Sequence, residues 1–287
     1  MRCIIHPNAT AFRTTCETFL LRDESEHNLI LGGLDGPEQN NPEKSHSVLI
    51  SIVREEAVAG AAILHPTERS MLSKMDAACC RALVAFILEQ GIPLHSVIGP
   101  IESSECFAES WKRSTGATPE LLLHTGVYEL TKILFPNADG RNLISIDAVD
   151  PALAFLYLLG FLADCFPNMV DPQQIARTIL DRHAKSQTLF FWQGPEDTAP
   201  VSMAAKSRES RNGATISLVY TPPQLRRQGH ASRMVAALSD RCLKEGKKFC
   251  NLFADVRNPT SNAIYQEIGY RKIGESKHFS LGNRLPS

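Results

Sequence analysis

Residues 226–231 read Arg-Arg-Gln-Gly-His-Ala, and these residue types in this order suit the binding of a phosphate group. The first amides of a helix have no partner inside the helix, and the helix dipole places partial positive charge there. Gly229 would let the backbone approach a bulky anion, while Arg226 and Arg227 add formal charge. The hexapeptide therefore predicts an anion site at the start of a helix. A solvated surface pair is the alternative interpretation of the two arginines.

The flanking segments are expected to place this hexapeptide between a strand and a helix. Residues 214–221 have the composition of a strand, which must end at Pro222 and Pro223 because proline cannot continue a hydrogen-bond ladder. The helix should run to about Gly246, and a second strand is expected at 248–255. The expected helix carries an apolar stripe made of Ala231, Met234, Val235, Leu238 and Cys242.

A third block follows, in which Asn258 precedes Tyr265 by seven residues and Gly269-Tyr270 closes the segment. With this block, residues 214–280 resemble the GNAT acyltransferase superfamily, which binds acyl-coenzyme A. The hexapeptide is similar to the pyrophosphate loop of that superfamily, and the block from Asn258 to Tyr270 is similar to its closing motif.

The resemblance implies a set of site residues. Backbone amides from about Arg227 to Ser232 would face the diphosphate, and the backbone at 218–220 would hold the pantetheine arm and polarise the thioester. Tyr265 takes the place of the general acid, with a core tyrosine as the alternative, and Asn258 would hold the pantetheine and could also cap a helix. The implied cofactor-binding residues are Leu218, Val219, Tyr220, Arg226, Arg227, Gln228, Gly229, His230, Ala231, Ser232, Asn258, Ser261 and Tyr265.

The general base is the least defined part of the expected site. Many GNAT enzymes use a glutamate on the motif strand, whereas this strand offers only Thr215, Ser217 and backbone. Asp255 is the candidate base and Glu209 is another, although both could be surface carboxylates. A relayed water or a group from residues 150–185 remains open. His230 is expected to be an exposed loop residue rather than a base.

Length and charge limit the function classes. A chain of 287 residues fits two domains, and 30 Lys and Arg against 31 Asp and Glu do not suit a nucleic-acid binder. Eight cysteines without Cys-x-x-Cys or Cys/His spacing predict buried thiols and no metal site. The apolar run at 151–163 is too short to span a bilayer, and the chain start does not resemble a signal peptide. We therefore expect a soluble cytoplasmic protein, monomeric or homodimeric, that binds neither nucleic acid nor membrane.

The first half of the chain repeats the order of the second. Segments at 47–53, 58–64, 73–90, 96–99, 104–114 and 120–131 predict strand, strand, helix, strand, helix, strand. We expect residues 1–135 to form a degenerate GNAT-like or α/β cap domain, joined through Phe135–Gly140 to a catalytic GNAT domain at 141–287. The expected phosphate-loop position of the first half, 65–71, has no glycine, and Glu68 would repel a diphosphate. The predicted fold class is α/β with a mixed sheet: a tandem GNAT fold whose first copy binds no cofactor.

The resemblance implies an N-acetyltransferase that uses acetyl-CoA as co-substrate. The acceptor would be the primary amine of a small molecule, an amino acid or a peptide, and it would attack the thioester directly. Helices expected at 152–165 and 172–185 would shape the acceptor site. Two alternatives stay open: a non-enzymatic acyl-CoA sensor or scaffold, and an acyltransferase that uses a longer acyl-CoA.

Overall fold

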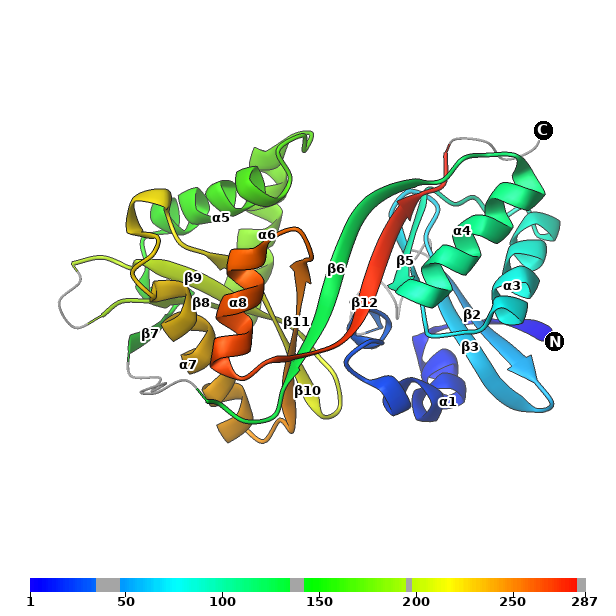
Figure 1. Cartoon of the computed structure of the whole chain (residues 1–287), viewed down its shortest axis with the longest axis horizontal. Helices are drawn as coiled ribbons and strands as arrows, with labels where there is room; N and C mark the ends of the chain where they lie inside the picture. The colour runs from blue at the N-terminus through cyan, green and yellow to red at the C-terminus, as the bar shows by residue number, and fades with distance from the viewer. Residues whose placement is uncertain (35–46, 135–141, 195–197, 283–287) are drawn as a thin grey trace. The chain divides into compact units, whose positions relative to one another are not determined.

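A computed structural model describes residues 1–34, 47–134, 142–194 and 198–282 (Figure 1). The chain forms two compact units that are not consecutive in sequence. Unit 1 comprises Met1–Val127, Ala254–Arg257 and Lys272–Ser287, and unit 2 comprises Tyr128–Phe253 and Asn258–Arg271. The chain therefore passes from one unit to the other several times.

Unit 1 contains one mixed sheet with helices on both faces. Its strands follow the order β1-β2-β3-β4-β5-β12-β6, and the β4–β5 pair is parallel. Its elements are β1 (Arg2–His6), α1 (Ala9–Leu20), α2 (Asn28–Gly33), β2 (Val48–Arg54), β3 (Ala57–Leu64), β4 (Arg69–Leu72), α3 (Ala77–Glu89), β5 (Ser96–Pro100), α4 (Ile101–Thr115) and most of β6 (Glu120–Leu130).

Unit 2 repeats this succession of elements. Its elements are β7 (Leu143–Ser145), α5 (Pro151–Cys165), α6 (Pro172–Ser186), β8 (Leu189–Trp192), β9 (Ser202–Glu209), β10 (Gly213–Tyr220), α7 (His230–Lys244), β11 (Phe249–Asp255) and α8 (Pro259–Ile268), followed by β12 (Arg271–Ser280). The order strand, helix, helix, three strands, helix, strand, helix, strand is thus the same in both halves of the chain. The predicted α/β class with a mixed sheet is confirmed.

Alternating side chains of the unit 2 sheet point into two different cores. Phe191 packs with α5 and α6, whereas its neighbour Phe190 lies 4.8 Å beneath the guanidinium carbon of Arg241 on α7. Period-two alternation along a strand produces this arrangement. In unit 1, one core joins β2 and β3 to α3 and α4, and another joins them to α1 and α2. The helices α5 and α7 therefore fix β10 from opposite faces.

The structure adds elements that the sequence patterns did not predict. The strands Arg2–His6 and Arg69–Leu72 and the helices Ala9–Leu20 and Asn28–Gly33 were all missed. The last strand was expected to complete the second domain, but from Lys272 onward it belongs to unit 1 and pairs antiparallel with β5, with His278 opposite Ile98. The expected joint at 135–140 lies outside the described residues.

Among the residues that the structure describes, no helix has the length and apolar character needed to cross a membrane.

Candidate functional site

The predicted phosphate loop lies on the surface of unit 2, directly before α7. Arg227 and Gly229 both have positive φ, 64° and 77°, and Gly229 is the residue that precedes the helix. No side chain in the described ranges caps this helix start. The first helical bond runs from the Arg233 amide to the Gly229 carbonyl at 3.1 Å, so the amides of residues 230–232 come before it. These are three of the amides from Arg227 to Ser232 that the sequence assigned to the diphosphate, although His230 is half-buried rather than exposed.

Arg233 adds a positive group that the sequence analysis missed. Its Nη1 donates to the Gln228 carbonyl at 2.9 Å, and the guanidinium lies 3.6 Å from the place where a Cβ on Gly229 would stand. The sequence could have predicted this position, because Arg233 follows Gly229 by four residues and one helical turn brings it back beside the loop. Helix dipole and guanidinium together make this loop electropositive.

Arg226 is engaged by the protein itself. Its Nε donates to the Thr221 carbonyl at 2.9 Å, and its Nη2 lies 2.5 Å from Oδ2 of Asp164 at the end of α5. Its guanidinium carbon also stands 5.8 Å from the centre of the Tyr220 ring. These contacts tie the loop to α5.

Strands β10 and β11 pair at their beginnings. Their parallel register runs from Gly213 opposite Phe249 to Thr215 opposite Asn251. Farther along, the register of β10 with β9 shifts between Ser217 and Tyr220, where Leu218 has a φ of 52°. A bulge of this kind turns backbone groups away from the ladder. Leu218, Val219 and Tyr220, the residues predicted to hold the pantetheine arm, therefore form an irregular, half-exposed strand end.

Tyr265, the predicted acid, is buried in α8. Its ring packs between those of Tyr128 and Tyr270, with ring centres 6.3 and 6.0 Å away. Burial raises the pKa of the Tyr265 hydroxyl well above its usual value, and the nearby Cys165 thiol raises it further. At neutral pH this phenol therefore carries its proton.

Asn258 caps α8. Its side-chain Oδ1 accepts a hydrogen bond from the Ser261 amide at 3.1 Å, so these two predicted cofactor residues form the start of the helix. The cap fixes the helix that carries Tyr265.

The two carboxylates considered as bases are both paired. Asp255 belongs to unit 1, where Arg257 donates to both of its oxygens at 3.1 and 2.9 Å and lowers its pKa. Burial opposes the ionisation of Glu209, but Lys206 and Lys247 outweigh it and lower the Glu209 pKa. A depressed pKa makes a carboxylate a weaker proton acceptor.

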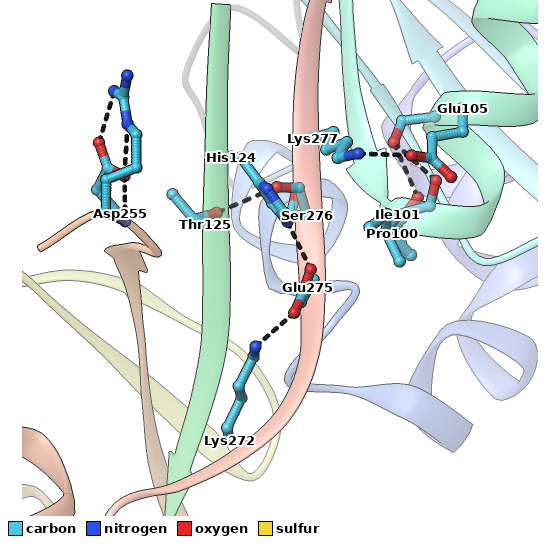
Figure 2. Close-up of polar contacts among 12 residues, drawn as sticks. Pro100, Ile101, Glu105, His124, Thr125, Asp255, Lys272, Glu275, Ser276 and Lys277 are labelled. Carbon is cyan, nitrogen blue, oxygen red and sulfur yellow. Dashed lines mark hydrogen bonds and ion pairs between the residues drawn. The ribbon is translucent and has the colours of Figure 1, made fainter. Parts of the chain in front are cut away.

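Unit 1 contains a further chain of polar side chains. His124 Nε2 on β6 lies 2.5 Å from Glu275 Oε2 on β12, and Lys272 contacts the other Glu275 oxygen (Figure 2). Hydrogen bonds from Lys272 and then His124 lower the pKa of Glu275. His124 and Glu275 are 151 residues apart, so local sequence patterns gave no signal for this contact.

The corresponding place in unit 1 is closed. Between β4 and α3 the chain is short, and the start of α3 is capped by Asp76, whose carboxylate accepts from the Cys79 amide at 2.9 Å. That bond and one from Arg54 lower the Asp76 pKa to about 2, so a negative charge occupies the helix start. A Cβ on Gly99 of β5 would stand 2.8 Å from the Leu72 carbonyl of β4, which shows how closely these strands approach.

This geometry corrects one detail of the sequence analysis. The loop before α3 comprises residues 73–76, whereas residues 65–71 form the β3–β4 turn and most of β4. The carboxylate that opposes an anion is that of Asp76 rather than that of Glu68.

Comparisons with known proteins identify the domain type of the second half of the chain. A family model described as an acetyltransferase (GNAT) domain matches residues 147–281. No curated protein matches the chain.

Solved structures share the fold along the whole chain. A GNAT-family acetyltransferase from Colwellia psychrerythraea is similar over 98% of this chain and 100% of its own, at 10% identity and a TM-score of 0.58. A GCN5-related N-acetyltransferase from Sphaerobacter thermophilus covers 96% and 94%, at 12% identity and a TM-score of 0.57. A tandem GNAT protein of the clavulanic acid biosynthesis pathway covers 100% and 99%, also at 12% and 0.57. With the family match, these likenesses bear out the recognised motifs: residues 147–281 match the GNAT acetyltransferase domain, and the chain shares its fold with GNAT proteins along its whole length.

Proposed function

We propose that this chain is an N-acetyltransferase that moves an acetyl group from acetyl-CoA to the primary amine of a small molecule, an amino acid or a peptide. Members of the family transfer acyl groups from acyl-CoA; the choice of acetyl and of an amine acceptor is our proposal. One observation carries it. Within unit 2, an uncapped helix start at Gly229 accompanies a bulged strand end at Leu218. The first suits a diphosphate and the second suits an extended amide-containing arm.

The residues present fit acyl-CoA. Helix amides at 230–232 and the Arg233 guanidinium are hydrogen-bond donors of the kind that a diphosphate requires. Gly229 leaves the approach to these amides without a side chain. When bound, the cofactor would supply the acyl group as an activated thioester.

The chain's own groups would then perform three tasks. A backbone amide near Leu218 polarises the thioester carbonyl, and a preorganised donor of this kind contributes about 3 kcal/mol. The amine nitrogen attacks the thioester carbon, the carbon–sulfur bond breaks, and the Tyr265 hydroxyl donates its proton to the leaving sulfur. Water removes the proton from the positively charged nitrogen of the adduct, because Asp255 and Glu209 are held by cations, and a proton from solvent restores the Tyr265 hydroxyl.

The setting that we propose is the cytoplasm. None of the eight cysteines, all within the described residues, forms a disulfide, which is typical of proteins from reducing compartments. The net charge of −1 offers no attraction for nucleic acid or an anionic membrane. The acceptor that we propose is therefore a small amine or a peptide terminus.

A free-thiol assay tests this function. The full chain is incubated with acetyl-CoA and a panel of primary amines, and thiol release and acetylated amine are measured together. We expect both to rise in equal amounts with at least one amine. Binding of acetyl-CoA without thiol release across the panel would overturn the proposal in favour of an acyl-CoA sensor, and a preference for longer acyl-CoA would correct the acyl group.

A further inference from the structure

Unit 2 contains a pocket between the start of α5 and the end of α6. Its volume is about 310 Å³, which lies in the range of small-molecule sites. Residues of the turn before α5 and of the last turns of α6 line it, and Pro151 is its contribution from α5. Asp164, which binds Arg226 of the cofactor loop, stands at the other end of α5, about 20 Å along the helix. The pocket is therefore distinct from the proposed acyl-CoA site.

The buried part of this pocket is apolar. Ile146 and Val149 are each 6% exposed and belong to the core that α5 and α6 share, and Leu180 packs against the same core. Ala184 follows Leu180 by one helical turn and lines the pocket beside it. The apolar body of a ligand would lose contact with water against these four side chains.

One side of the pocket is held in shape by Gln187. This residue ends α6 with a φ of 52°, in the left-handed region that favours glycine. Two side-chain bonds hold it there: Ser145 Oγ donates to Gln187 Oε1 at 2.7 Å, and Gln187 Nε2 donates to the Ala184 carbonyl at 2.8 Å. This side of the pocket is therefore formed before any ligand arrives.

Two carboxylates give the pocket a negative charge. Asp147 lines it from the turn before α5, and Asp181 lines it from α6. In the part of the chain that the structure describes, neither carboxylate has a hydrogen-bond or ion-pair partner, although Lys185 follows Asp181 by one helical turn. The carbonyls at the end of α6 add partial negative charge, while Asp150 caps the start of α5 and offsets the positive end of that helix. The charges around the pocket therefore favour a cation.

We propose that this pocket binds a small organic cation in which a planar amidinium or guanidinium group carries an apolar body. Carboxylates bind such planar groups through paired, charge-assisted hydrogen bonds. The apolar body would cover Ile146, Val149 and Leu180, which an inorganic cation would leave uncovered. The inference does not rest on the proposed function, because no residue of the pocket belongs to the acyl-CoA site.

Titration of the full chain with three planar probes of nearly equal size tests this inference. Benzamidine is the cation, benzamide its neutral counterpart and benzoate its anionic counterpart. Spectra of isoleucine and leucine methyl groups, recorded by nuclear magnetic resonance, report on the pocket. We expect benzamidine to shift the Ile146 and Leu180 methyl signals and to bind about tenfold or more tightly than benzamide, because hydrogen bonds between ionised groups are about twice as strong as neutral ones. Benzoate should not bind.

Four variants locate the probe. Asp147→Asn and Asp181→Asn should each weaken benzamidine binding about tenfold and leave benzamide binding within twofold. Ala184→Phe places a ring in the pocket and should abolish the binding of both. Glu267→Gln is the matched control, because it removes the same charge from an exposed position on α8 and should bind benzamidine normally. Circular dichroism checks that each variant is folded.

Several outcomes would overturn the inference. Equal affinities for the three probes would show that charge does not decide binding, and unchanged benzamidine binding to the two asparagine variants would place the probe elsewhere. Loss of benzamidine binding when acetyl-CoA is added would place the cation in the cofactor site. A failure of acetyl transfer to every amine would remove the proposed function and leave the result for this pocket as it stands.

Discussion

At the scale of single residues, burial keeps the Tyr265 hydroxyl protonated at neutral pH. A buried phenol resists ionisation, and the Cys165 thiol adds to this effect. We predict that Tyr265→Phe lowers kcat about 100-fold or more, the usual contribution of a positioned acid, and leaves the Kd of acetyl-CoA within twofold. Stopped-time kinetics and calorimetry measure the two quantities.

Tyr270→Phe provides the control for this prediction. Its ring contacts that of Tyr265, but its hydroxyl is bonded to Ser239 Oγ at 2.7 Å. Its loss should lower the free energy of unfolding by about 1 kcal/mol without a comparable loss of kcat. Equal losses of turnover in both variants would show that the Tyr265 effect comes from packing.

His183 makes the stability of unit 2 sensitive to acid. It is 2% exposed, its Nδ1 contacts Thr188 Oγ1 at 2.6 Å, and burial followed by the charge of Arg182 lowers its pKa from 6.5 to about 4. The unfolded chain therefore binds a proton more readily than the folded one between these values. The stabilisation is complete above pH 6.5 and is lost as pH falls toward 4.

Urea unfolding at pH 7 and pH 5 checks this sign. The free energy of unfolding should fall between these two pH values, with about 3 kcal/mol as the upper bound from this histidine over its full range. His183→Gln should reduce the fall, although His278 shifts in the same direction and keeps part of it. If the free energy of unfolding of His183→Gln fell as much between pH 7 and pH 5 as that of the wild type, His183 would not be the source of the acid sensitivity.

At the scale of elements, the Asp164–Arg226 pair connects α5 with the phosphate loop. The two side chains are 47% and 42% exposed, so the pair should contribute no more than about 1 kcal/mol to stability. We predict that Asp164→Asn and Arg226→Ala raise the acceptor KM to a similar extent, and that the double variant is no worse than either. Acetyl-CoA affinity should change less than threefold.

A different result would show that Arg226 binds the cofactor itself. If Arg226→Ala weakens acetyl-CoA binding tenfold while Asp164→Asn does not, Arg226 contacts the diphosphate directly, as the sequence alone suggested. Measurement of both ligands for both variants separates the two roles.

Some elements around the site could be predicted from the sequence and others could not. Pro222, Pro223 and Gly229 are local signals, so the strand end and helix start could be predicted. The bulge at Leu218 could not, because leucine has no preference for positive φ and the bulge depends on pairing with β9. The helix Ala9–Leu20 was readable but missed: Asn8 caps it, with apolar residues three or four apart.

At the scale of the whole molecule, long-range pairing was the part that sequence patterns could not supply. Residues 272–280 belong to unit 1 because β12 pairs antiparallel with β5. No local feature of the β12 sequence identifies β5 as its partner. The contact between His124 and Glu275 follows from this placement of β12. The shared order of elements, by contrast, was visible because helix and strand periods repeat in both halves.

The two units share one succession of elements, yet among the residues that the structure describes only unit 2 combines the features of a cofactor site. In unit 1, Asp76 occupies the helix start and β4 lies against Gly99. In unit 2, Gly229 leaves the helix start open and β10 bulges at Leu218. We therefore expect one acyl-CoA per chain.

Titration calorimetry of the full chain with acetyl-CoA tests this central claim most directly. We predict one site per chain in the wild type, and no binding to Gly229→Glu, where a carboxylate would face the diphosphate. Gly246→Glu is the matched variant, because Gly246 also has a positive φ, 100°, and open space around it, but lies beyond the far end of α7. It should bind normally. Two sites per chain, or unchanged binding to Gly229→Glu, would contradict the account.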